Sequence, residues 1–112
     1  MMKFYKYLYF DEDIKNIDKV KHRLKVHSGN PDLYAICLSM GNDQLDIINA
    51  AFFKQKFYRK YPPIIAGISK SHDGAVKLVT QMIEESLSKT GKADIKEYLV
   101  LRTKTKDFTK EN

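Results

Sequence analysis

The stretch "SKSHDG", residues 69–74, holds the side chains with the clearest potential for ligand chemistry. It follows an apolar run and precedes a segment of helical periodicity, and ligands of α/β proteins gather at such junctions. The Ser69 and Ser71 hydroxyls and the Lys70 ammonium could hold a phosphate or a carboxylate, and Gly74 permits a close approach of the backbone. The sequence therefore predicts a candidate anion site at Ser69, Lys70, Ser71 and Gly74.

A structural role is the alternative for this loop. Ser71 or Asp73 is a suitable helix cap, and a carboxylate in the first turn already interacts with the helix dipole, which disfavours a second anion. Neither G-x-x-x-x-G-K-[ST] nor G-x-G-x-x-G occurs in the chain. His72 beside Asp73 is half of an acid–base arrangement, but no G-x-S-x-G or other nucleophile motif accompanies it, so no catalytic constellation is predicted.

The second candidate is the segment "FFKQKFYRKY", residues 52–61, in which cations alternate with aromatic rings and no acid intervenes. Three interpretations stay open: a solvated helix end, a contact with a partner or a second copy, and stacking on unpaired nucleic-acid bases. The candidate surface residues are Lys54, Lys56, Tyr58, Arg59, Lys60 and Tyr61.

The net charge of +6 gives only weak support to nucleic-acid binding, because the basic excess is spread along the chain. Residues 1–61 carry eleven basic and seven acidic side chains, and residues 62–112 carry nine and seven. Nucleic acid is therefore the less favoured partner. The adjacent carboxylates at 84–85 are interpreted as solvent-facing residues of a helix.

Neither a metal nor a cofactor is predicted. His22 and His27 are five residues apart, which places them on different faces of a helix. The single cysteine, Cys37, lies in an apolar run and is expected to be a buried, inert thiol. No apolar run approaches the roughly 20 residues that span a bilayer, and no signal peptide is evident, so a cytoplasmic protein without a membrane segment is expected.

These candidates require a framework of strands and helices. Apolar or aromatic runs predict three strands, at 3–10, 33–40 and 63–69. The first helix is expected to start at Asp11 or Asp13 and to end at Ser28-Gly29-Asn30-Pro31. A turn at Gly41-Asn42-Asp43 precedes a second helix through residue 57, and the central alanines disfavour the alternative of a strand through "LDIINAAFF".

The clearest helix runs from Ala75 to its end at Lys89-Thr90-Gly91, and a last helix opens at Asp94 with Glu97 as in a capping box. The resulting order is β-α-β-α-β-α-α. It predicts an α/β fold with a mainly parallel three-stranded sheet, in which the direction of the first strand stays open. Residues 1–103 are expected to form one domain, followed by a polar tail over 104–112.

The stretches "YKYLYF", "YAICLSM", "YRKYPPIIAGISKSHDGAVKLVTQMIEES" and "TGKADIKEYL" resemble a group of small uncharacterised proteins of anaerobic Gram-positive bacteria. The likeness covers almost the whole chain. Because that group has no assigned activity, the resemblance implies no functional residue. The residues themselves favour a small, non-enzymatic binding or protein-interaction module, with self-association of two copies as one form of it.

Overall fold

A four-stranded mixed sheet, in the order β1-β4-β2-β3, forms the centre of the molecule. The computed structural model describes residues 2–26, 30–39 and 44–104. β1 (Lys3–Phe10) lies parallel to β4 (Ile64–Ser69), whereas β2 (Tyr34–Leu38) is antiparallel to both β4 and β3 (Leu45–Asn49). The α/β class is confirmed. The expectation of a mainly parallel three-stranded sheet is wrong.

The additional strand, β3, lies in the segment that the sequence placed in the second helix. Only residues 45–49 are extended, and a 3-10 helix, η1 (Ala50–Lys54), and a short helix, α2 (Lys56–Lys60), follow. The strand places Ile47 and Ile48 on opposite faces of the sheet, where β-branched side chains pack well. The Asn49 side chain then accepts a hydrogen bond from the N–H of Ala51, 2.9 Å away, which starts η1. The alanines that disfavoured a strand lie just beyond its end.

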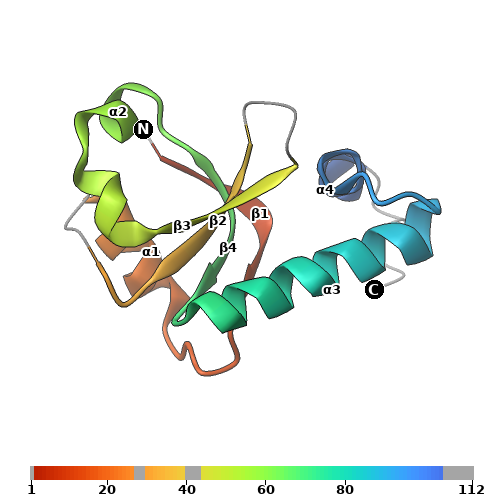
Figure 1. Ribbon diagram of the computed structural model, residues 1–112, viewed down its shortest axis with the longest axis horizontal. Helices are drawn as coiled ribbons and strands as arrows, with labels where there is room; N and C mark the ends of the chain where they lie inside the picture. The colour runs from red at the N-terminus through yellow and green to blue at the C-terminus, as the bar shows by residue number, and fades with distance from the viewer. Residues whose placement is uncertain (1, 27–29, 40–43, 105–112) are drawn as a thin grey trace.

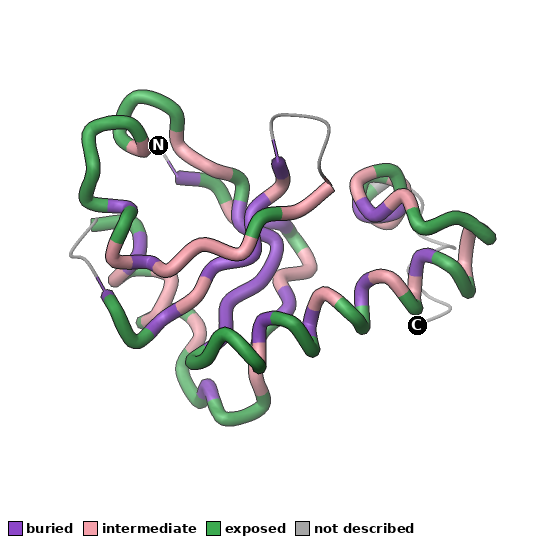
Figure 2. The backbone as a smooth tube through the Cα atoms, viewed as in Figure 1, coloured by how far each residue is buried: buried purple, intermediate pink, exposed green. Residues whose placement is uncertain are grey.

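The helices cover both faces of the sheet (Figure 1). α1 (Ile17–Lys25), η1 and α2 lie on one side, and α3 (His72–Thr90) and α4 (Ile95–Lys104) lie on the other. The central strands β2 and β4 pass through the buried interior between these layers (Figure 2). No helix in the described ranges is long and apolar enough to cross a membrane.

Two apolar clusters, one on each face of the sheet, form the core. The α1 face contains Ile14, Leu24, Leu33, Ala35, Phe53, Ile65 and Ile68. The α3 face contains Tyr5, Ile36, Ala75, Met82, Ile95, Tyr98 and Leu99. A shift of register in β4 turns Ile65 and Ile68 to the same face although they are three residues apart.

The helix ends explain which predicted boundaries are correct. The Ser71 hydroxyl accepts a hydrogen bond from the Gly74 N–H at 2.9 Å, and Gly91 ends α3 in the left-handed region, as expected. The Asp94 carboxylate likewise accepts from the Glu97 N–H at 3.1 Å. The predicted start of the first helix is wrong, because Asn16 caps α1.

α1 ends at Lys25, earlier than predicted. Of the expected stop Ser28-Gly29-Asn30-Pro31, residues 28 and 29 lie outside the described residues, as does the predicted turn at 41–43.

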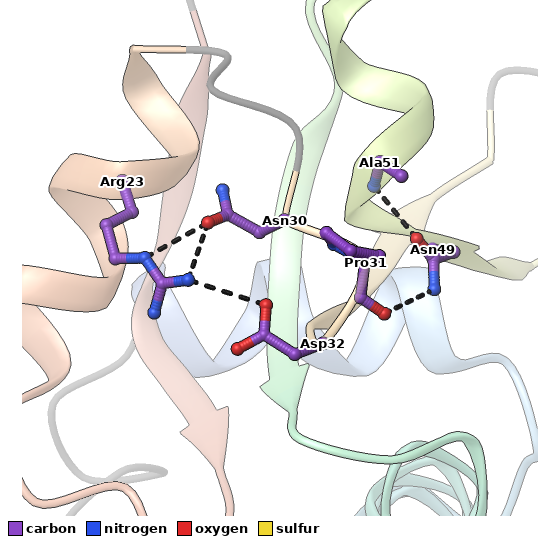
Figure 3. Close-up of polar contacts among 6 residues, drawn as sticks. All are labelled: Arg23, Asn30, Pro31, Asp32, Asn49 and Ala51. Atoms are coloured by element: carbon purple, nitrogen blue, oxygen red, sulfur yellow. Dashed lines mark hydrogen bonds and ion pairs between the residues drawn. The ribbon is translucent and has the colours of Figure 1, made fainter.

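Polar contacts tie α1 to the strand that follows it (Figure 3). Arg23 donates two hydrogen bonds to the Asn30 side-chain oxygen, at 3.0 and 2.6 Å, and lies 3.4 Å from the Asp32 carboxylate. The Asn49 amide donates to the Pro31 carbonyl at 3.0 Å. These bonds fix the entry of β2 against both α1 and the end of β3.

Candidate binding surfaces

The loop 69–74 is tied to the chain's own carboxylate at Asp11. The Asp11 side chain accepts a hydrogen bond from the Ser69 hydroxyl at 2.8 Å and from the Lys70 N–H at 2.7 Å. The Ser71 N–H donates to the Ser69 oxygen at 3.2 Å. Of the donors that the sequence assigned to an external anion, the Ser69 hydroxyl therefore already binds a carboxylate, that of Asp11 directly after β1.

The remaining residues of this loop are equally constrained. The Lys70 ammonium donates to the Asp13 carbonyl at 3.3 Å. A Cβ atom on Gly74 would lie 2.2 Å from the Ser69 oxygen, so glycine is required here for close approach and not for a positive φ. The loop brings together all four predicted residues, Ser69, Lys70, Ser71 and Gly74. An anion site at this loop stays a prediction.

A hollow lies beside α2, where β2 ends and β4 begins. It encloses about 550 Å³. We call this hollow the α2 pocket. Its lining residues are Cys37, Leu38, Ser39, Asp46, Ile48, Phe57, Tyr58, Tyr61, Pro62, Pro63, Ile64 and Lys96. Most of these side chains are apolar or aromatic, as in sites that bind apolar groups.

Two of the predicted surface residues, Tyr58 and Tyr61, line this pocket. Tyr58 is half-buried and contacts the buried Phe53 ring edge-on, with centroids 5.2 Å apart. Phe57 and Tyr61 stand at the rim, where they are 56% and 44% exposed. Their ring centroids lie 5.4 Å apart. The sequence thus identified the aromatic wall of the pocket but not its opposite walls.

The predicted cations of this segment lie outside the pocket lining. These cations are Lys54, Lys56, Arg59 and Lys60. All four are exposed, and none makes an ion pair with a described residue. They lie in the same segment, 54–60, that supplies Phe57 and Tyr58 to the aromatic wall.

Four residues of the pocket lining with polar or ionisable side chains were not predicted as site residues: Cys37, Ser39, Asp46 and Lys96. Asp46 and Lys96 supply one charge of each sign, and Cys37 forms part of the floor. Burial, with a smaller effect of the nearby Asp46 carboxylate, raises the pKa of the Cys37 thiol to about 12. The expected inert, buried thiol fits this environment. Cys37 and Asp46 come together because β2 pairs with β3, in a register that places these two residues opposite each other. Only knowledge of that pairing could have revealed their proximity.

A second polar group, the Glu85 cluster, joins β1, α3 and α4. Glu85 accepts hydrogen bonds from the Tyr9 hydroxyl at 2.5 Å, the Tyr98 hydroxyl at 3.0 Å and the Gln81 amide at 3.0 Å. The Arg102 guanidinium donates to the Tyr9 oxygen at 2.7 Å. The interpretation of Glu85 as a solvent-facing residue is therefore wrong, because Tyr9 and Tyr98 turn it toward the interior.

The titration of the cluster follows from these bonds. Burial by itself would raise the pKa of Glu85, but the hydrogen bonds from Tyr9, Gln81 and Tyr98 and the charge of Arg102 outweigh it and lower the pKa. Burial and the neighbouring Glu85 carboxylate raise the pKa of Tyr9 and of Tyr98. Glu85 is thus ionised in the cluster, and the Tyr9 and Tyr98 phenols are neutral. Because Tyr98 and Arg102 belong to α4, these contacts stabilise the packing of α4.

The two described histidines, His22 and His72, form no common site. His72 packs edge-on against Tyr34, with ring centroids 5.8 Å apart, while His22 is exposed on α1 and His27 lies outside the described residues. Within residues 2–26, 30–39 and 44–104, no group of three or more metal-ligating side chains is brought together.

Comparisons with protein-family models, with characterised proteins and with solved structures found no match to this chain, so the resemblance noted from its sequence stays a prediction.

Proposed function

We propose that this protein is a binding module and that the α2 pocket receives an apolar or aromatic side chain of another protein chain. One observation carries the proposal: a hollow of about 550 Å³ with mostly apolar walls opens between Phe57, Tyr61 and Ile64. These three rim residues are 43% or more exposed. Apolar surface gathered around a cavity favours association with a partner, and aromatic anchors in such pockets dominate binding energies.

The charges around the pocket select among partners. Lys56, Arg59 and Lys60 project from α2 without acidic partners in the described structure. A partner that places acidic residues beside its apolar anchor is favoured over a basic one. Self-association through Tyr58 and Tyr61 is the form of the proposal that can be measured with the protein alone.

A dye and a hydrodynamic measurement test the proposal together. The probe is 1-anilinonaphthalene-8-sulfonate, an aromatic anion whose fluorescence rises in apolar pockets. We expect saturable fluorescence with the wild type and its loss in the double variant Phe57→Ser/Tyr61→Ser. The matched control is Val26→Ser, which removes an apolar side chain of similar exposure (55%) from the end of α1. Near-UV circular dichroism verifies that each variant keeps its tertiary packing, since molten states also bind this dye.

Sedimentation velocity over a range of concentrations then separates the two kinds of partner. If two copies associate through the pocket, Tyr61→Glu weakens association and Val26→Glu does not. A monomer whose pocket binds the dye supports a different protein as the partner. Equal dye binding by the wild type and the Phe57→Ser/Tyr61→Ser variant would refute the α2 pocket as the binding surface.

Nucleic-acid binding through residues 54–61 is the second candidate. The observation in its favour is that the exposed rings of Phe57 and Tyr61 stand among four exposed cations. Bases stack on such rings while cations follow the backbone. We expect oligothymidine binding that falls steeply with salt and weakens in Lys56→Ala/Arg59→Ala but not in the control Lys15→Ala/Lys19→Ala. Absence of binding at low salt would remove this candidate.

A further inference from the structure

A groove lined by three cations and no acid lies beside β1, on another part of the molecule. Its volume is about 340 Å³. β1 contributes four of its lining residues, α1 contributes two and α4 contributes one. The cations are Lys6 of β1, Lys21 of α1 and Arg102 of α4, and the aromatic rings are Tyr7 and Phe10. We call this feature the β1 groove.

β1 is an edge strand. It lies at the end of the order β1-β4-β2-β3 and pairs only with β4 among the described strands. Backbone N–H and C=O groups that point away from β4 therefore have no strand partner in this part of the structure. Such an edge is a template for an extended segment of another chain, which adds to the sheet through main-chain hydrogen bonds.

The lysines along this edge lie near aromatic rings. The Lys6 ammonium lies 5.4 Å from the Tyr7 ring centroid, and the Lys21 and Lys25 ammonium groups lie 5.3 and 5.7 Å from the Phe4 ring. None of these lysines forms an ion pair with a described residue. Their charges remain available to an anionic ligand.

Arg102 adds a partly used guanidinium on the opposite face. Its carbon lies 5.0 Å from the Tyr7 ring, and one nitrogen donates to Tyr9 and lies 3.8 Å from the Glu85 carboxylate. The Nε atom is buried and has no hydrogen-bond partner in the described structure. Of the five N–H donors of the Arg102 guanidinium, only one thus makes a short hydrogen bond to a described residue.

We propose that the β1 groove binds an extended, acidic segment of another protein, which adds to the sheet as a strand beside β1. Side chains of an added strand alternate between the two faces of the sheet. Acidic side chains on one face would meet Lys21 of α1, and those on the other face would meet Arg102 of α4. This division of charge between two helices matches the alternation of a strand.

Alternative explanations account for less of the geometry. Lysines within an edge strand prevent aggregation, but that role does not require cations from α1 and α4 beside it. Pairing of β1 with β1 of a second copy would add the charges of Lys3 and Lys6 from both copies to one short edge, which like-charge repulsion disfavours. A nucleic acid would use the charges but not the free backbone edge.

The test uses a fluorescein-labelled peptide, EEVVEEVV, whose adjacent glutamates place carboxylates on both faces of an added strand. We expect fluorescence anisotropy to report binding to the full-length protein, weakened about tenfold by Lys6→Glu/Lys21→Glu. The matched control Lys77→Glu/Lys92→Glu makes the same charge change at two exposed lysines that line neither the β1 groove nor the α2 pocket, and it should bind as the wild type does. If the charge reversals unfold the protein, Lys6→Gln/Lys21→Gln provides the same comparison.

A second peptide, EEVPEEVV, keeps the charge but lacks one backbone N–H and resists strand pairing. The proposal requires that it bind more weakly, and that EEVVEEVV slow amide hydrogen exchange in residues 3–10. Equal binding of both peptides, equal loss in both double variants, or unchanged exchange in β1 would overturn it. Displacement of EEVVEEVV by a short oligothymidine that binds more tightly at the same lysines would assign the groove to nucleic acid instead.

Discussion

Asp11 and Ser69 lie 58 residues apart in the sequence, yet the carboxylate of one accepts the hydroxyl hydrogen of the other at 2.8 Å. The same oxygen of Asp11 accepts the Lys70 N–H at 2.7 Å. Parallel pairing of β1 with β4 makes this possible, because the carboxyl ends of parallel strands meet at one edge of a sheet. Asp11, in the turn after β1, thus holds Ser69 and Lys70 in place directly before α3 begins.

Asp11→Ala should destabilise the protein by about 1–3 kcal/mol, because the buried Ser69 hydroxyl and the Lys70 N–H lose their acceptor. Urea unfolding measures the change. Asp13→Ala is the control, since only the backbone carbonyl of Asp13 bonds to Lys70. The same pair of variants probes the predicted anion site. If phosphate raises the melting temperature of Asp11→Ala and not of the wild type, the internal carboxylate occupies that site.

Gly74→Ala should lower the free energy of unfolding by about 1–3 kcal/mol for a different reason. The new Cβ would lie 2.2 Å from the Ser69 oxygen and 3.1 Å from an Asp11 oxygen, so the network itself must move. The helix would otherwise gain from the substitution, since alanine has the higher helix propensity. An unchanged or increased free energy of unfolding would show that the loop can rearrange freely.

The sequence predicted the elements whose local signals agree with their tertiary environment. α3 has a wide apolar stripe, a serine cap and a terminal glycine, and all three features have their expected roles. β4 is a short apolar run with three isoleucines between two prolines and a polar loop, and it forms within one residue of its predicted bounds, 63–69. In these segments propensity, periodicity and end signals give the same answer.

Residues 45–49 were mispredicted as helix because their structure depends on distant pairing. Leu45 and Ile48 fit a helical stripe, but the partners Leu38 and Ala35 of β2 hold this stretch extended. The same pairing creates the wall of the α2 pocket opposite Phe57 and Tyr61. The aromatic half of the site was therefore predictable from local composition. The half at Cys37, Asp46 and Lys96 depends on strand register and on the position of α4.

The Glu85 cluster makes stability depend on pH in the acid range. The folded-state pKa of Glu85 lies below its ordinary value of 4.5, so ionised Glu85 stabilises the fold above that value, and the contribution is lost as the pH falls through the lowered pKa. Glu85→Gln should cost about 1–2 kcal/mol at neutral pH, and this cost should shrink below about pH 4.5.

Urea unfolding of the wild type and Glu85→Gln from neutral pH to about pH 3 measures this difference. Glu84→Gln is the matched control, because the adjacent Glu84 is exposed. The difference in free energy of unfolding between Glu84→Gln and the wild type should not shrink as the pH falls. A cost of Glu85→Gln that stays constant with pH would mean that the hydrogen bonds, and not the charge, carry its effect.

Cys37 is a reporter of the α2 pocket that is already present in the chain. Its pKa of about 12, in place of 9.0, lowers the thiolate fraction near pH 8 roughly a thousandfold. Because the thiolate is the reactive form, Ellman's reagent should label the folded protein slowly and the urea-unfolded protein rapidly. A ligand seated in the pocket that Cys37 lines should slow the labelling further. Labelling of native Cys37 as fast as that of the unfolded chain would show that β2 and α2 separate readily, and the pocket would then be open only in part of the population.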